Sequence, residues 1–148
     1  MPITLSVNSR RSKVVTIADL REALIPVSAE RFRELSVALD HGGPSLHALL
    51  NGKRGWLMYL RHNDGDPGFS SRNPAFDASN LPPDAPASIS RFDGTPTLVL
   101  EYRLSNGQVD EYPASWVLPE QEIMRALEYF VEHEGNRAPF VTWHDDSL

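Results

Sequence analysis

The chain has 148 residues, of which 41% are hydrophobic and 23% are charged, and its formal net charge is −6. This composition is that of an ordinary globular protein long enough to bury a core, and the absence of cysteine excludes disulfides and Cys-ligated zinc. The N-terminus has no basic region followed by an apolar run, and no apolar run is long enough to span a bilayer, so we expect a cytoplasmic protein that does not bind membranes.

Charge is distributed unevenly along the chain. Residues 1–61 contain nine Lys and Arg against five Asp and Glu, a balance of +4, whereas residues 62–148 contain five Arg against fifteen Asp and Glu, a balance of −10. An acidic half repels phosphate backbones, which argues against nucleic acid as the ligand, and it attracts basic partners. A solvated surface that aids solubility would give the same composition.

The first elements of the chain are short. Alternation over residues 3–7 predicts a strand, and the basic cluster at 10–13 is interpreted as a solvated turn. Thr16 precedes Asp19 by three residues, as in a helix cap, and helical spacing follows, so a short helix is expected over 17–24.

An antiparallel meander is predicted over residues 34–61. The preceding stretch, 28–33, fits either a helical turn or a linker. Two alternating segments follow, separated by a break at 42–44, and Asn51-Gly52 is a strong hairpin signal that leads into an apolar strand at 56–61.

The middle of the chain is rich in turns and proline. Residues 62–68 are predicted as a turn or loop and 69–72 as a short strand. The segment 73–96 is predicted as a Pro-rich loop, because a helix cannot run through that proline density. Such a loop is either an ordered functional segment or a plain surface excursion.

The last third of the chain contains clearer patterns. A second hairpin is predicted from strands 97–103 and 109–112, joined at Asn106-Gly107. A helix follows over 119–134, with an apolar stripe along one side, and a short strand over 139–143 closes the chain.

We therefore predict one α+β domain over residues 1–148. It consists of an antiparallel sheet of about five to six strands, with the helix near 119–134 packed on one face and a short N-terminal helix. The strand and helix within 1–33 form a variable N-terminal part, and 73–96 is the Pro-rich loop.

The sequence contains no catalytic signature. His62-Asn63-Asp64-Gly65-Asp66 groups possible metal ligands, but the bidentate acid that ends a calcium loop is missing, and a polar hairpin loop explains the segment better. None of the five histidines belongs to a ligand pair or catalytic motif. We expect no metal, no cofactor and no catalytic residue, although an enzyme site assembled from distant residues is the alternative.

Several segments together resemble a known family. They are Asn51 to Leu60, Asp64-Gly65 with Phe69 to Ser71, the Asn106-Gly107 hairpin, the helix from Pro119 through Phe130, and Arg137-Ala138-Pro139 with Thr142-Trp143. In this pattern the chain resembles the first immunity-protein family of bacterial polymorphic toxin systems. The resemblance covers about residues 34–147. The shared motifs are turns and aromatic residues that position a fold.

The resemblance implies a small α+β immunity protein, encoded beside a secreted toxin, that protects the producing cell. Members of this family are associated with nucleic-acid deaminase toxins, among other classes. A zinc-dependent deaminase acting on nucleic acid needs a positively charged channel, and an acidic inhibitor could occupy it. The predicted partner is thus a basic cognate toxin domain, and the predicted action is binding and occlusion.

We expect the contact surface on the loop 62–72, the Pro-rich segment and the second hairpin. Acidic and aromatic residues there suit a cationic partner. The predicted contact residues are Asp64, Asp66, Phe69, Arg72, Asp77, Asp110, Glu111 and Trp116. The alternative function is a non-catalytic interaction or regulatory module unrelated to toxins.

Overall fold

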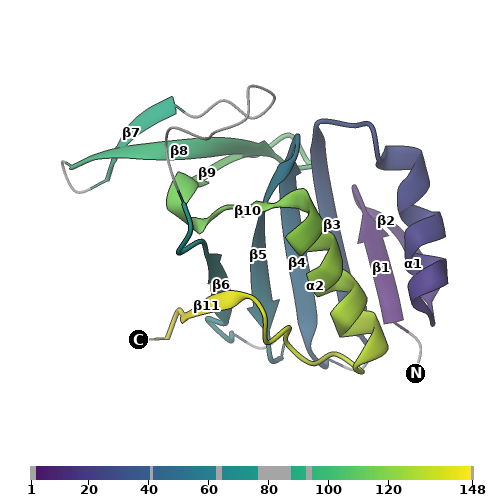
Figure 1. Ribbon diagram of the computed structural model, residues 1–148. Coiled ribbons are helices and arrows are strands. Elements are labelled where there is room, and N and C mark those ends of the chain that lie inside the picture. The colour runs from purple at the N-terminus through teal and green to yellow at the C-terminus, as the bar shows by residue number, and fades with distance from the viewer. Residues whose placement is uncertain (1–2, 41, 63–64, 77–87, 93–94, 148) are drawn as a thin grey trace.

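The structure is a computed structural model that describes residues 3–40, 42–62, 65–76, 88–92 and 95–147. Within these residues the strands form two antiparallel sheets, a large one of eight strands and a small one of three. Figure 1 shows helix α2 lying across one face of the large sheet, α1 beside it near the β1 edge, and the small sheet projecting from the opposite edge.

The large sheet has more strands than the five to six predicted. Its spatial order is β11-β6-β5-β4-β3-β1-β2, and β10 pairs with the end of β5. All of its neighbours are antiparallel, as predicted. The strands are β1 (Ile3–Val7), β2 (Arg10–Val14), β3 (Phe32–Leu39), β4 (Ser45–Asn51), β5 (Arg54–Leu60), β6 (Phe69–Arg72), β10 (Leu118–Pro119) and β11 (Thr142–Asp145).

Strand β2 replaces the turn predicted from the basic cluster. Asn8 and Ser9 both have positive φ, 48° and 73°, which is the geometry of a two-residue hairpin loop. Four of the five β2 residues are exposed. Charged side chains on an exposed edge strand discourage pairing with other chains, and they also hide the apolar alternation that normally reveals a strand.

The small sheet contains β7 (Ser88–Phe92), β8 (Thr95–Arg103) and β9 (Val109–Pro113). The predicted second hairpin is confirmed as β8–β9, but it belongs to this separate sheet. Strand β7 lies within the segment 73–96 that the sequence predicts as a loop, and residues 77–87 and 93–94 of that segment are outside the described residues.

The helices agree with the sequence patterns. Helix α1 (Ile17–Leu24) begins with the expected capping box between Thr16 and Asp19, and η1 (Ile25–Val27) extends it before β3. Helix α2 (Glu120–Glu132) matches the predicted main helix, and η3 (Ala114–Trp116) precedes β10. Within the described residues neither α-helix combines the length and hydropathy that a bilayer crossing requires.

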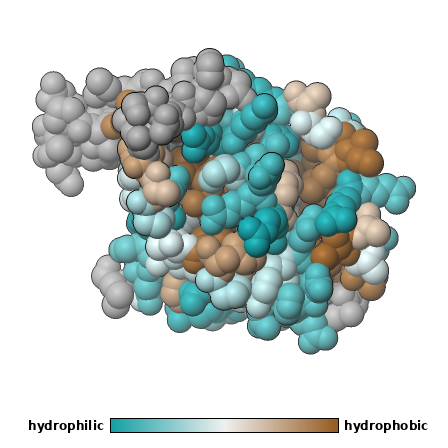
Figure 2. All heavy atoms as spheres, in the orientation of Figure 1, coloured by the Kyte–Doolittle hydropathy of each residue, from teal (hydrophilic) through white to brown (hydrophobic). Residues whose placement is uncertain are grey.

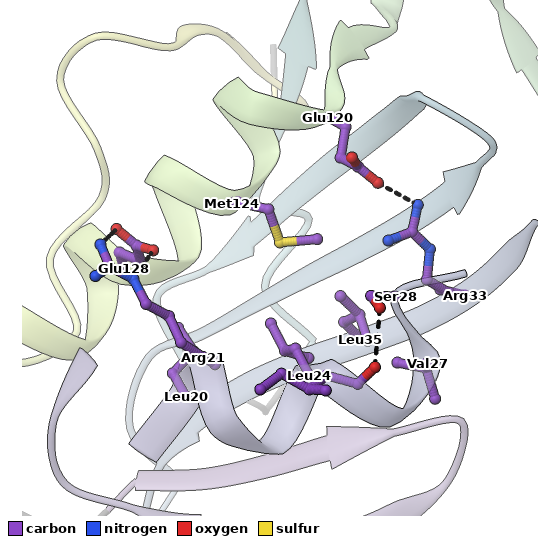
Figure 3. Close-up of a pocket in the computed structure, with 11 residues that line it drawn as sticks. Leu20, Arg21, Leu24, Val27, Ser28, Arg33, Leu35, Glu120, Met124 and Glu128 are labelled. Atoms are coloured by element: carbon purple, nitrogen blue, oxygen red, sulfur yellow. Dashed lines mark hydrogen bonds and ion pairs between the residues drawn. The ribbon is translucent and has the colours of Figure 1, made fainter. Parts of the chain in front are cut away.

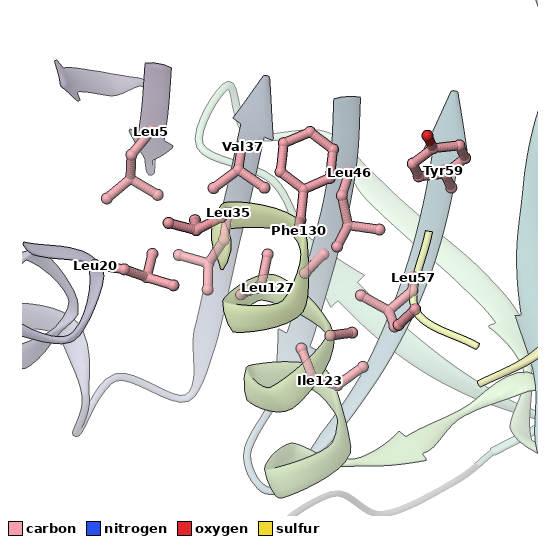
Figure 4. Packing of buried hydrophobic residues seen from close by; sticks show 14 of the residues in the cluster. Leu5, Leu20, Leu35, Val37, Leu46, Leu57, Tyr59, Ile123, Leu127 and Phe130 are labelled. Atoms are coloured by element: carbon pink, nitrogen blue, oxygen red, sulfur yellow. The ribbon is translucent and has the colours of Figure 1, made fainter. Parts of the chain in front are cut away.

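The main core lies between α2 and the large sheet. Figure 4 shows Leu127 and Phe130 of α2 directed at the side chains of β3, β4 and β5, while Leu20 of α1 closes the side near Leu5. Leu127, Phe130 and Leu5 are fully buried. Burial of this apolar surface is the main favourable contribution to folding.

A second cluster joins the two sheets. On the other face of the large sheet, Leu49 and Trp56 pack against Leu100 and Tyr102 of β8. Asn51 at the end of β4 adds a polar link, because its side-chain nitrogen donates to the Glu101 carbonyl oxygen at 2.7 Å. The small sheet is therefore held against one end of the face that α2 leaves open.

Removing the hydroxyl group should affect the free energy of unfolding differently at two buried tyrosines. Tyr59 donates to the Gly135 carbonyl oxygen at 2.7 Å, whereas the Tyr102 hydroxyl is buried without a hydrogen-bond partner among the described residues. We expect Tyr59→Phe to lower the free energy of unfolding by about 1 kcal/mol, and Tyr102→Phe to leave it unchanged or raise it by up to about 1 kcal/mol. Urea unfolding measures both, and equal losses would contradict the assignment.

Candidate functional site

The open face of the large sheet carries a row of mostly polar side chains. Residues paired across neighbouring antiparallel strands lie on the same face, so the strand register places this row from β1 to β11. Its members are Ser6, Ser36, His47, Met58, Ser70 and His144. The side chains that contact α2 alternate with them and point to the opposite face.

Aromatic side chains of the small sheet build a wall at one end of this row. Tyr112 of β9 stacks on Trp56 of β5, with ring centroids 4.1 Å apart and planes 10° apart. Trp116 lies next to Tyr112 at 6.3 Å. Stacking fixes the hairpin relative to the large sheet, because the two rings bury apolar area in one specific geometry.

The row and the wall enclose a hollow of about 580 Å³. Its floor includes His47, Met58 and Ser70 of the large sheet, and its wall includes Tyr112 and Trp116. This volume is within the range of ligand sites, but the hollow is open to solvent along the sheet. It can therefore receive a side chain or loop of another protein.

The hollow is acidic. Glu34, Asp110 and Asp146 line it, and none of the described lining residues is Lys or Arg. Burial lowers the pKa of His47, with an opposing effect of Glu34, so the imidazole is neutral at pH 7. Arg72 borders the hollow, covers Trp116 and interacts electrostatically with Asp146. Glu34 and Asp110 still present negative charge beside Tyr112, a combination that attracts a cationic group.

Hydrogen bonds orient two of these carboxylates. Asp110 accepts from Gln108 Nε2 at 2.7 Å and from the Tyr112 hydroxyl at 3.3 Å. Burial, together with Asp110, raises the pKa of Tyr112 to about 12, so its hydroxyl keeps the proton that it donates. Asp146 accepts from Ser70 Oγ at 2.9 Å.

Comparison with known protein families identifies the chain. The family model of immunity protein Imm1 matches residues 9–145. The chain belongs to the Imm1 family. No curated protein matches the chain with significance. The match confirms the resemblance inferred from the turns and aromatic residues, and membership in an immunity-protein family implies a toxin as the binding partner.

The structure brings together only some of the contact residues predicted for this Imm1 family member. Asp110 and Trp116 line the hollow. Arg72 borders it, with its guanidinium carbon 3.8 Å from the centroid of the Trp116 ring and its Nη1 donating to Ser70 Oγ at 2.9 Å. Glu111 is exposed on the other face of β9, opposite Glu101. Asp64 and Asp77 are outside the described residues.

Asp66 and Phe69 have structural contacts away from the hollow. Asp66 accepts hydrogen bonds from the Arg61 backbone at 2.8 Å and from its guanidinium at 2.7 Å, and its side chain is only 1% exposed. Phe69 pairs with Tyr59 on the helix-covered face, and the Arg137 guanidinium lies 3.8 Å from its ring centroid. These contacts stabilise the turn before β6.

Glu34, His47 and Asp146 line the hollow but are not among the predicted contact residues, and the sequence left Tyr112 as either an anchor for a cationic partner or a residue folded inward. Of these, His47 had a signal, since alternation placed it opposite the apolar residues of its strand. The other three join the hollow only through strand order and the packing of β9 on β5, which no local pattern specifies.

The ion pair of Asp66 should make stability depend on pH. The Arg61 side chain and backbone hold the pKa of Asp66 well below its ordinary value of 3.8. An Asp whose pKa is lower in the folded state than in the unfolded state, where it is about 3.9, stabilises the fold at pH values above 3.9. This stabilisation is lost as the pH falls from about 3.9 through the pKa of the folded state. We expect Asp66→Asn to lower the free energy of unfolding at pH 7 and to lower it less at about pH 2. Urea unfolding at both pH values checks this, and an equal difference at both would contradict it.

Proposed function

We propose that the protein inhibits a cognate secreted toxin by binding it with the open-face hollow and blocking access to the toxin's own substrate-binding surface. Family membership supports the toxin as partner. The carboxylates of the lining, which belong to neither hydrophobic cluster, and the aromatic rings beside them support this location. The protein acts by occlusion and does not act as a catalyst.

The hollow suits an arginine or lysine side chain of the toxin. A guanidinium or ammonium group could pair with Asp110 or Asp146 while its stem packs on Tyr112, since Arg72 already covers Trp116. Hydrogen bonds already orient both carboxylates, so less conformational freedom is lost on binding. Such a buried, aromatic-walled contact is typical of the residues that dominate interface energies.

The toxin class that best fits this chemistry acts on nucleic acid. Enzymes of that kind have a positively charged substrate channel, and the balance of −10 over residues 62–148 complements it. A zinc-dependent nucleic-acid deaminase is the specific candidate, in line with the toxins associated with the resembled family. The inhibitor would exclude the polyanionic substrate by offering carboxylates at the channel.

Co-expression with the toxin domain encoded beside the gene tests this function. We expect co-purification as a stoichiometric complex, survival of cells that express both chains, and death of cells that express the toxin alone. Killing that is undiminished by the protein would contradict the proposal and favour the alternative, an interaction module with no toxin partner.

Charge reversal tests the hollow itself. We expect Asp110→Lys with Asp146→Lys to raise the Kd for the toxin by at least about tenfold, because close charge pairs at interfaces contribute about 1.5 kcal/mol or more. Calorimetry or surface plasmon resonance measures the change.

The matched control is Glu132→Lys with Glu134→Lys at the exposed end of α2. It changes the net charge equally, so long-range attraction between the partners falls to a similar extent in both variants. The control should stay within about threefold of the unmodified protein. Equal losses in the two variants would remove the hollow from the interface.

A further inference from the structure

A second pocket lies on the helix-covered side of the large sheet, between α1, β3 and α2. Figure 3 shows its walls, and Figure 2 shows apolar residues at the surface beside α1. The pocket has a volume of about 250 Å³. Its apolar walls include Leu20, Leu24, Val27, Leu35 and Met124. Ile25, also a lining residue, is 67% exposed, so apolar surface continues outward from it.

One wall of this pocket contains a buried guanidinium with unused donors. Arg33 is 4% exposed, and the only hydrogen bonds of its side chain to described residues run from Nη2, to Glu120 and to the Gly52 carbonyl oxygen. Nε is buried without a partner among the described residues. Figure 3 shows the other terminal nitrogen, Nη1, directed across the pocket toward Met124. No described residue accepts a hydrogen bond from Nη1, so this nitrogen can donate to an acceptor inside the pocket.

The charges around the pocket are already balanced. Arg33 pairs with Glu120, and Arg21 pairs with Glu128 at 2.9 Å on the other rim. An additional charged group inside an apolar pocket would lack a counter-ion and would lose its hydration. A neutral oxygen atom, by contrast, can accept from Nη1 without disturbing either pair.

We propose that this pocket binds an uncharged amphipathic molecule, with a short aliphatic chain among Leu20, Leu24 and Met124 and a hydrogen-bond-accepting oxygen on Nη1 of Arg33. The volume is below the usual range for larger ligands, which restricts the chain to a short one. The site is independent of toxin inhibition, because it lies on the opposite face of the large sheet from the hollow.

Octanamide is the probe, with octanoate and octylammonium as charged molecules of equal chain length. We expect saturable shifts in the amide NMR signals of Leu20, Leu24 and Arg33, with a Kd of about 1 mM or below for octanamide. Both charged probes should bind at least about tenfold more weakly, because each brings an unpaired charge into the pocket.

Two variants locate the chain and the oxygen. Met124→Phe fills part of the pocket and should weaken octanamide binding about tenfold. Arg33→Lys keeps a cation for Glu120 but removes the donor that faces the pocket, and should also weaken binding about tenfold. Met58→Phe is the matched control, because it places the same substitution in the open-face hollow, and it should change octanamide affinity less than twofold.

Three results would overturn this proposal: no saturation of the unmodified protein at concentrations about tenfold above 1 mM, octanoate binding as tightly as octanamide, or unchanged affinity in Met124→Phe. The probe comparison on the unmodified protein requires no variant to fold. Since Met124→Phe should leave toxin inhibition intact, failure here is distinguishable from failure of the proposed inhibitory function.

Discussion

The stacking of Tyr112 on Trp56 is the contact on which the candidate site depends. The two rings, 4.1 Å apart, join a hairpin of the small sheet to a central strand of the large one. The Asn51 bond to the Glu101 carbonyl oxygen fixes the same junction from the end of β4. Without this junction the open face would be a flat sheet surface. With it, the polar row acquires an aromatic wall and becomes a hollow.

The two faces of the large sheet differ in the side chains that they carry. Alternation along each strand sends Leu35, Val37 and Leu57 toward α2, where burial stabilises the fold, and sends Ser36 and His47 to the open face. The main core lies on the helix-covered face, and the second cluster occupies only the end of the open face that meets the small sheet, so the other residues of the open face are available for recognition. This division suits an immunity protein, whose recognition surface can change with its toxin while the core is retained.

Local patterns in the sequence predicted most of the elements but not their assembly. Capping at Thr16, the turn at Gly52 and the apolar stripe of α2 depend on neighbouring residues, and the structure confirms all three. Strand β2 was missed because its exposed basic residues show no alternation. Among the residues that line the hollow, Asp110 and Trp116 were predicted as contact residues. Glu34 and Asp146 were not, because only the strand order and the packing of the two sheets bring them to the hollow. Those contacts are long-range, and a single sequence does not encode them as a pattern.

The central claim is that the open face, and not the helix-covered face, contacts the toxin. The three tryptophans of the chain report on both faces, since Trp56 and Trp116 line the hollow and Trp143 packs against the main core. Fluorine NMR of protein labelled with 5-fluorotryptophan, recorded with and without the toxin, compares them directly. The account predicts a large shift or broadening of the Trp116 signal and little change at Trp143. A shift of Trp143 with Trp116 unchanged would contradict it.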